Sequence, residues 1–176
     1  KAGDYTITNC AYTGQMAVVG SNVGGIIGDV YTAQKLTIHG AKVAETAKIS
    51  GTAAVGGIIG NTNNDNDITI TNSANSAAVT GTGNNVGGIV GYNGKTALKI
   101  KDCVNNGVIS GVNQVGGILA QNNHSDTSVI SCTNNGAVSG AGTSSNIGGI
   151  VGYNGKASIE IQACTNNGSV SGTTAV

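Results

Sequence analysis

The sequence predicts an all-β fold, a single-stranded parallel β-solenoid (β-helix) with about 31 residues per coil. Three observations lead to this prediction: a motif recurs at nearly constant spacing, short segments alternate apolar and polar residues, and the composition disfavours helices. Nearly six coils fit in 176 residues, so we expect one solenoid domain over residues 1–176. Crossovers between parallel strands are overwhelmingly right-handed, which predicts a right-handed solenoid.

The repeated motif is Val-Gly-Gly-Ile or a close variant. Its copies begin 32, 31, 29 and 32 residues apart, at Val23, Val55, Val86, Val115 and Ile147, and a partial last coil runs to residue 176. A second segment, Ile/Val-Ser/Thr-Gly, begins at Ile49, Val79, Ile109, Val138 and Val170. A third segment alternates apolar and polar residues, as in YTITNC, ITITNS and LKIKDC. Each period therefore predicts three short strands joined by turns.

The composition excludes the other repeat architectures of similar period. Glycine accounts for 30 residues, Pro, Phe and Trp are absent, and the apolar residues are mainly Val, Ile and Ala. Helical repeat arrays need amphipathic helices, which frequent glycine and the absence of Arg do not support. Propeller blades are longer and carry a tryptophan signature. Eight Lys balance eight acidic residues, and no long apolar run occurs, so we expect neither a nucleic-acid partner nor membrane insertion.

The stretch GGIVGYNGKT, residues 87–96, has the appearance of a phosphate-binding loop but fails its requirements. The motif needs a glycine at position 89, where this chain has Ile89, and it needs a helix to begin at Lys95. The residues that follow alternate as a strand does, and the stretch returns at residues 148–157 with Ala157 in place of the hydroxyl residue. We therefore interpret it as structural repeat, not as a nucleotide site.

Stacked coils place equivalent residues in columns. One predicted column contains only small residues, which suits an inward-facing position at a tight corner: Cys10, Ala41, Ser73, Cys103, Cys132 and Cys164. The three Asn-Asn-Gly segments, which begin at Asn105, Asn134 and Asn166, are predicted to stack as turns in which the glycine and one Asn adopt positive φ. Their side-chain amides can form a ladder along the stack.

The VGGIVG segment leaves two interpretations open, because both of its faces carry apolar residues. Either a bulge at Gly87-Gly88 turns Val86 and Ile89 to the same side, or this face of the solenoid is partly covered from outside.

The cysteine column bears on disulfides and metals. Cys10 has Ala41 above it, and stacked parallel positions orient both Cβ atoms the same way, which disfavours disulfide geometry. We expect buried free thiols, with one disulfide within Cys103, Cys132 and Cys164 as the alternative. His39 and His124 lie far from any cysteine pair in the sequence, so no zinc site is expected.

The candidates for ligand chemistry lie in or beside turns. Asp65 and Asp67 form the densest acidic stretch and could line one edge of the solenoid with Asp29, His124 and Asp126; calcium is the cofactor considered, against solvated turns. Aromatic rings on an edge can stack on sugars, so Tyr92 and Tyr153, with Tyr31 near the equivalent place in the first coil, are candidates for glycan binding, against simple packing. We expect no catalytic residue and no cofactor.

The Gly-Ile-hydrophobic-Gly core, seen as GIIG at Gly25 and Gly57 and as GIVG at Gly88 and Gly149, resembles the GLUG motif of bacterial surface proteins. The pattern CTNNGxVSG…GGIVGYNG is similar to repeat tracts of secreted adhesin-like proteins and of some immunoglobulin A peptidases. This chain departs in using Ile for Leu and in having Ala120 in place of the last glycine of the fourth copy. The resemblance implies a scaffold and carries over no catalytic residue.

These features predict a non-catalytic structural or adhesive segment of an extracellular or cell-surface bacterial protein, not an enzyme. Host or environmental glycans or proteins are the expected partners. Two alternatives stay open: a subunit that self-associates through open solenoid ends into filaments, and a glycan-acting β-helix enzyme.

Overall fold

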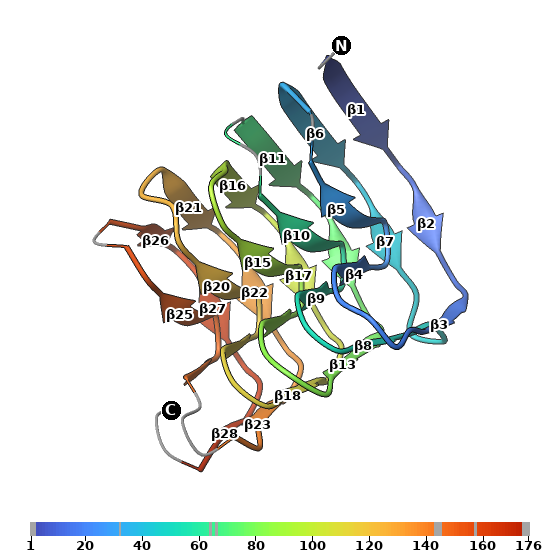
Figure 1. Ribbon diagram of the computed structural model, residues 1–176, viewed down its shortest axis with the longest axis vertical. Coiled ribbons are helices and arrows are strands. Elements are labelled where there is room, and N and C mark those ends of the chain that lie inside the picture. The colour runs from blue at the N-terminus through green and yellow to red at the C-terminus, as the bar shows by residue number, and fades with distance from the viewer. Residues whose placement is uncertain are drawn as a thin grey trace.

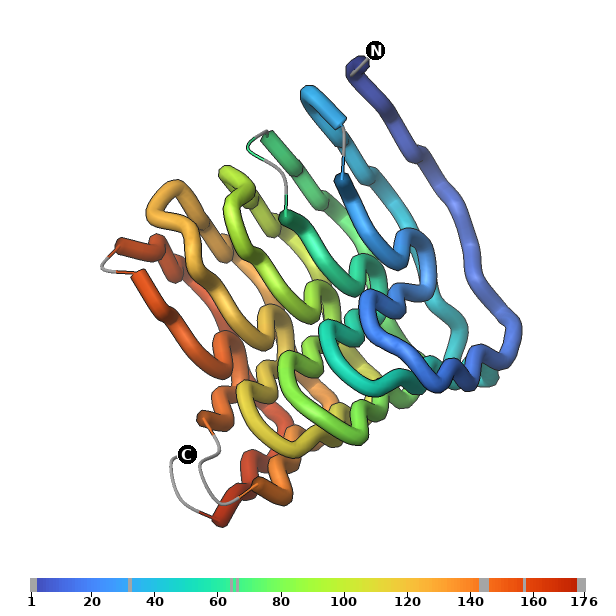
Figure 2. Tube along the Cα trace, viewed as in Figure 1, coloured from blue at the N-terminus to red at the C-terminus, as the bar shows by residue number. Residues whose placement is uncertain are grey.

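The computed structural model describes residues 3–31, 33–63, 65, 67–142, 146–156 and 158–173. The chain is a parallel β-solenoid in which each of the first five coils contributes one strand to each of five sheets, and three further strands begin a sixth coil. Figure 2 shows the coils stacked in one row, with the first (blue) and the last (red) at opposite ends. The described part of the chain contains no helix, and so none that could span a membrane.

Three of the sheets have six strands, and all neighbours within them pair in parallel (Figure 1). Sheet A contains β1 (Asp4–Thr8), β6 (Lys35–His39), β11 (Asp67–Thr71), β16 (Ala97–Lys101), β21 (Thr127–Ile130) and β26 (Glu160–Gln162). Sheet B contains β2 (Ala11–Tyr12), β7 (Lys42–Val43), β12 (Ala74–Asn75), β17 (Val104–Asn105), β22 (Thr133–Asn134) and β27 (Thr165–Asn166). Sheet C contains β3 (Gln15–Ala17), β8 (Lys48–Gly51), β13 (Ala78–Gly81), β18 (Ile109–Gly111), β23 (Val138–Gly140) and β28 (Val170–Ser171).

The other two sheets have five strands each and come from the repeated VGGI motif and the residues after it. Sheet D contains β4 (Val23–Gly24), β9 (Val55–Gly56), β14 (Val86–Gly87), β19 (Val115–Gly116) and β24 (Ile147–Gly148). Sheet E contains β5 (Ile27–Val30), β10 (Ile59–Thr62), β15 (Val90–Asn93), β20 (Leu119–Asn122) and β25 (Val151–Asn154). A turn leads from sheet E to sheet A of the next coil, and the same order of five strands then repeats.

The core consists of columns of β-branched and Leu side chains inside the coils. In sheet A, Ile38, Ile70, Ile100 and Val129 are paired by the register and have no exposed surface. Val and Ile suit this position because their branched side chains pack well on a pleated surface. The columns are exposed at both ends of the described stack, where Tyr5 and Ile161 are each 50% exposed.

Five strands per coil replace the three that the sequence predicts. A residue with positive φ divides the alternating segment into β1 and β2, and its equivalents do the same in the later coils: Asn9, Gly40, Asn72, Asp102, Ser131 and Ala163, with φ between 50° and 66°. The VGGI segment is divided by a bend at its second glycine and the Ile that follows, as at Gly25-Ile26 and Gly88-Ile89, without positive φ. Short bends of this kind leave no trace in hydrophobic alternation, which is why the sequence merges the strands.

The bend in VGGIVG decides between the two interpretations of that segment. Val86 in β14, Val90 in β15 and Ile89 between these strands are all fully buried in the core. The backbone N–H groups of Ile89 and Val90 both donate to the Ile118 carbonyl, at 2.9 and 3.0 Å. This two-to-one pairing is a local bulge-like bend that turns the apolar side chains inward, as in the first of the two alternatives.

The predicted positive φ in the Asn-Asn-Gly segments is wrong. Among the described glycines only Gly40 has positive φ, and none of the Asn residues in these segments does. Glycine is needed there because stacked coils approach closely: a Cβ atom on Gly136 would lie 1.9 Å from the Gly107 carbonyl oxygen. The amide ladder itself is present, and it is buried.

Candidate functional site

Buried asparagines form a hydrogen-bonded ladder through the middle of the solenoid. Nδ2 of Asn75 donates to Oδ1 of Asn105 at 2.8 Å, and the pattern continues to Asn134 and Asn166 at 2.7 Å each. Each amide also donates to the backbone carbonyl two residues on, such as that of Gly107 at 2.9 Å. Asn75, Asn105 and Asn134 have no exposed surface, so this part of the ladder is structural, and only Asn166 in the last coil is exposed.

A second buried ladder holds the start of the turns between sheets E and A. Oδ1 of Asn93 accepts from Oγ1 of Thr62 at 2.8 Å, and Nδ2 of Asn93 donates to Oδ1 of Asn122 at 2.9 Å. Asn122 in turn donates to Oδ1 of Asn154 at 2.8 Å. This ladder is not among the features predicted from the sequence, although the recurrence of Asn in YNG, QNN and YNG is a signal for it.

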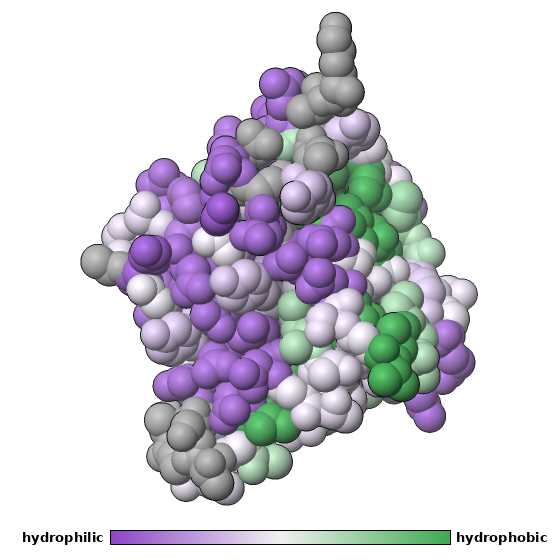
Figure 3. Space-filling view, in the orientation of Figure 1, coloured by the Kyte–Doolittle hydropathy of each residue, from purple (hydrophilic) through white to green (hydrophobic). Residues whose placement is uncertain are grey.

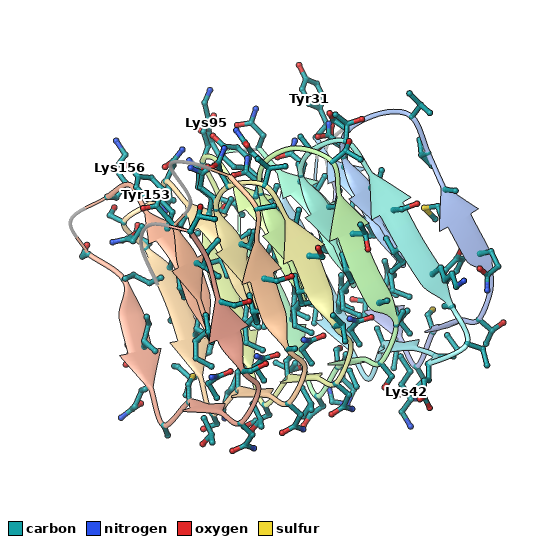
Figure 4. The ribbon with its side chains drawn as sticks, turned by 90° about the horizontal axis from the view of Figure 1, so that it is seen from below. Tyr31, Lys42, Lys95, Tyr153 and Lys156 are labelled. Carbon is teal, nitrogen blue, oxygen red and sulfur yellow. The ribbon has the colours of Figure 1, made fainter. Side chains whose placement is uncertain are left out.

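The turns anchored by this ladder lie along one edge of the solenoid, which we call the turn edge. It comprises the described residues of 31–34, 63–66, 94–96, 123–126 and 155–159. Asn93, Asn122 and Asn154 are in register, so the residues two positions later, Lys95, His124 and Lys156, come from successive coils. Figure 4 shows Lys95 and Lys156 projecting from the same side of the solenoid, and Lys42 from the opposite side.

A hollow of about 560 Å³ opens on the turn edge, lined by Asp65, Gly94, Lys95, Asn123, His124, Gly155 and Lys156. Its two glycines keep it open: a Cβ atom on Gly94 would lie 2.6 Å from Oδ1 of Asn63, and one on Gly155 would lie 2.3 Å from Oδ1 of Asn123. Hydrophilic residues dominate this part of the surface, over the later strands of sheet E and the turns that follow them (Figure 3).

His124 is held in a fixed orientation inside the hollow. Its backbone N–H donates to Oδ1 of Asn122 at 3.2 Å, and its carbonyl accepts from Nδ2 of Asn122 at 2.8 Å. Nδ1 of the ring accepts from the backbone N–H of Asp126 at 3.1 Å. In the neutral ring the proton is therefore on Nε2, which leaves an N–H donor for a ligand.

Two of the three predicted tyrosines lie beside glycines of this hollow without lining it themselves. The register aligns Tyr92 and Tyr153 with Gln121 between them, and Cε1 of each ring lies beside a lining glycine, 2.9 Å from a Cβ built on Gly94 and 3.1 Å from one built on Gly155. Nδ2 of Asn123 donates to the Tyr92 hydroxyl at 3.0 Å, which fixes that ring.

Tyr31 does not belong to this column. The register aligns Asp29 with Asn61 and Tyr92, so Tyr31 lies two residues past the equivalent place. It projects from the same side as Tyr153 in Figure 4, is 75% exposed and borders a separate, smaller hollow beside Tyr5 and Leu36 at the first coils.

The acidic candidates are dispersed. Asp65 lines the hollow with His124; Asp67 begins β11 and lies with Asp126 in a different depression, beside Lys35 and Lys99. Asp29 accepts hydrogen bonds from the Nδ2 atoms of Asn22 and Asn61, at 3.0 and 2.9 Å. Among the described residues, no three His, Cys, Asp or Glu side chains gather in a way that could hold a metal ion.

The small-residue column lies directly before the strands of sheet B. Ala41, Ser73, Cys103 and Cys132 are buried, whereas Cys10 is exposed and Cys164 is half-buried, each in an outermost coil. All four cysteines are free, and the Cys103 and Cys132 thiols donate to backbone carbonyls 3.3 Å away. The adjacent Cys132 thiol and burial raise the pKa of Cys103, and burial raises the pKa of Cys164.

The segment Gly94-Lys95-Thr96 leads into strand β16, so no helix N-terminus is present to hold a phosphate. The hollow instead combines residues that sequence reasoning did not bring together: Lys95, His124 and Lys156. The signal for them was weak, because the three residue types differ and the turns that carry them are unequal in length.

No family model matches the sequence, and no curated protein matches it. The fold is similar to a solved one: the crystal structure of a putative immunoglobulin A1 protease from Bacteroides ovatus superimposes with a TM-score of 0.64 at 22% sequence identity. The similarity covers 96% of this chain and 51% of the other, so this chain spans about half the length of that neighbour. At this identity, the likeness shows the β-solenoid fold alone.

Proposed function

We propose that the chain is a non-catalytic scaffold segment of a secreted or cell-surface bacterial protein, a rigid spacer whose turn edge presents a binding surface. One observation carries the proposal: the polar residues that recur through the repeat hydrogen-bond to each other inside the stack. Asn105 and Asn134, for example, have no exposed surface, and their amides hydrogen-bond within the ladder and to backbone carbonyls. Repetition here maintains a structure and does not copy a reactive group.

The resemblance of the GIIG and GIVG segments to GLUG repeats supports a place in the extracellular protein of a bacterium. The solved neighbour from Bacteroides ovatus shares the β-solenoid fold. That neighbour is a putative protease about twice as long as this chain, and proteolysis is an alternative to the scaffold role.

Turnover assays test the proposal against both enzymatic alternatives. We expect the purified 176-residue chain to leave immunoglobulin A1 and pectin-like or mucin glycans intact, as measured by mass spectrometry of the products. Cleavage that disappears in a variant with Asp65→Ala and Asp67→Ala, or in His124→Ala, would overturn the proposal and identify an enzyme.

Self-assembly is a second candidate, favoured by apolar side chains at the end coils. Val19 is fully exposed and Val18 is 44% exposed after β3, while Ile161 is 50% exposed in β26. Exposed strand edges pair readily with other chains. Sedimentation velocity and electron microscopy of the purified chain decide: monomers at high concentration exclude this candidate, and regular fibres would make assembly the function.

A further inference from the structure

The hollow on the turn edge has an arrangement of charge that the scaffold does not need. Lys95 and Lys156 are exposed and come from coils that are two apart, so their attachment points are separated by about 10 Å, twice the strand spacing. His124 lies in the coil between them. No ion pair involves either lysine among the described residues, where the structure has one salt bridge, between Lys101 and Asp102.

The hollow also has a fixed shape. Asn122 holds the backbone of His124 on both sides, and the ring presents Nε2–H because Nδ1 is occupied by the Asp126 N–H. Asn123 uses its amide on protein partners: it donates to the Tyr92 hydroxyl and accepts from Nε2 of Gln121 at 3.2 Å. Donors that are already oriented lose little entropy when a ligand binds.

The chemistry of this lining selects a class of ligand. Two ammonium groups and an imidazole N–H favour negative charge, and the flat rings of Tyr92 and Tyr153 beside the two glycines suit the faces of sugar rings. The separation of the attachment points of Lys95 and Lys156 is close to the length of a disaccharide unit. Carboxylates on alternate sugars of one glycan chain therefore suit ion pairs with both lysines. Nucleic acid fits less well, because its binding depends on many phosphate contacts and the net charge of the chain is zero.

We propose that this hollow binds an acidic glycan, with uronate or sialate carboxylates on Lys95 and Lys156, the His124 Nε2–H between them, and sugar rings against Tyr92 and Tyr153. The proposal deepens the proposed function, since it names the partner of the turn edge and rests on the chain being a scaffold. Asp65, at the border of the hollow, opposes such a ligand by charge repulsion and sets an upper limit on its affinity.

Titration calorimetry with oligogalacturonate, an oligosialate, inorganic polyphosphate and a neutral oligosaccharide of matched length tests the proposal. We expect at least one acidic probe to bind, and we expect Lys95→Gln with Lys156→Gln to weaken binding by more than about tenfold, since each loses a charge-assisted hydrogen bond. Lys42→Gln, on the opposite side of the solenoid, is the matched control and should change affinity less than about twofold. Asp65→Asn should tighten binding by a few fold, which only an anionic ligand explains.

Four outcomes would overturn this inference: no binding of any acidic probe, equal binding of the neutral probe, equal loss with Lys42→Gln, or equal binding of inorganic polyphosphate. Circular dichroism of each variant checks that the β-solenoid is intact. Because Lys95 and Lys156 are exposed, we expect their substitution to leave the fold unchanged. Failure here leaves the scaffold proposal standing, whereas turnover of a glycan would overturn the scaffold proposal even if the hollow binds its substrate.

Discussion

A Cβ atom on Gly88 would lie 2.5 Å from Cγ of Asn105. The second glycine of the VGGI motif therefore faces the buried ladder, and its missing side chain is the space that the amide occupies. The same relationship holds between Gly57 and Asn75, and again in the next two coils for Gly117 with Asn134 and Gly149 with Asn166. The glycine motif and the Asn-Asn-Gly segments are two halves of one packing arrangement.

Substitution of this glycine is expected to be severe. Gly88→Ala would put a methyl group 2.0 Å from the Gly117 carbonyl oxygen as well as against Asn105, and neither backbone nor ladder can move away. We expect a loss of roughly 3 kcal/mol or more in the free energy of unfolding, measured by urea denaturation. Gly20→Ala is the control, because its Cβ would meet only a Val18 methyl at 3.4 Å and should be nearly neutral. Equal stability of the two variants would contradict the packing described.

The Asn-Asn-Gly segment contains its own matched pair for testing the ladder. The side chain of Asn105 is buried and hydrogen-bonds to Asn75, Asn134 and the Gly107 carbonyl. The side chain of Asn106 is exposed, and its hydrogen bonds, to Ser76 at 3.4 Å and from Asn135 at 2.8 Å, lie at the surface. Asn105→Ala should cost about 2–4 kcal/mol, because it leaves the amides of Asn75 and Asn134 short of a partner in the core. Asn106→Ala should cost less than about 1 kcal/mol. Chemical denaturation measures both, and a larger loss for Asn106→Ala would be inconsistent with a buried ladder.

The residue at the corner between sheets A and B has a left-handed backbone conformation, so substitution by glycine there is expected to stabilise the fold. Ser131 is exposed and has a φ of 51°, a conformation that favours glycine. Ser131→Gly should raise the free energy of unfolding by about 0.5–1 kcal/mol. In the equivalent position Gly40→Ala should be destabilising, because φ is 66° and the new Cβ would also meet Oδ1 of Asn9 at 2.4 Å. Ser131→Ala is the control for loss of the hydroxyl, and thermal melts that rank it above Ser131→Gly would refute the argument.

The thiols provide a prediction with a defined pH dependence. The hydrogen bond between Cys103 and Cys132 raises the pKa of Cys103, as burial also does, and lowers the pKa of Cys132, so folding favours a pair in which Cys103 keeps its proton. That contribution is complete below the ordinary thiol pKa of 9.0 and is lost as pH rises through and above it, because the unfolded chain then releases the proton first. The free energy of unfolding should therefore fall with rising pH in this range, and less steeply in Cys103→Ala. Cys10→Ala, in an exposed position, is the control for removal of a thiol outside this pair.

Thiol alkylation gives an independent check on the same residues. In the native chain Cys10 should react first and Cys164 more slowly, with Cys103 and Cys132 protected until unfolding. Under denaturing conditions more than two thiols should titrate, and a reducing agent should barely change the melting temperature. Two fully formed disulfides would be incompatible with the column before sheet B.

The sequence by itself determined the β-solenoid, its period of about 31 residues and the positions that stack, because a repeat of short strands can bury its apolar face only against its own copies. It also placed Cys103 and Cys132 in one column of small residues, since equivalent positions must lie above one another. What only the tertiary structure decided depends on how neighbouring coils stack on one another. Gly88 yields space to Asn105 of the next coil, and Gly136 yields space to the Gly107 carbonyl of the preceding coil, whereas positive φ occurs at other positions such as Ser131. The same stacking brings Lys95, His124 and Lys156 of three successive coils to one hollow. No local pattern encodes these contacts, because each of them joins residues of different coils.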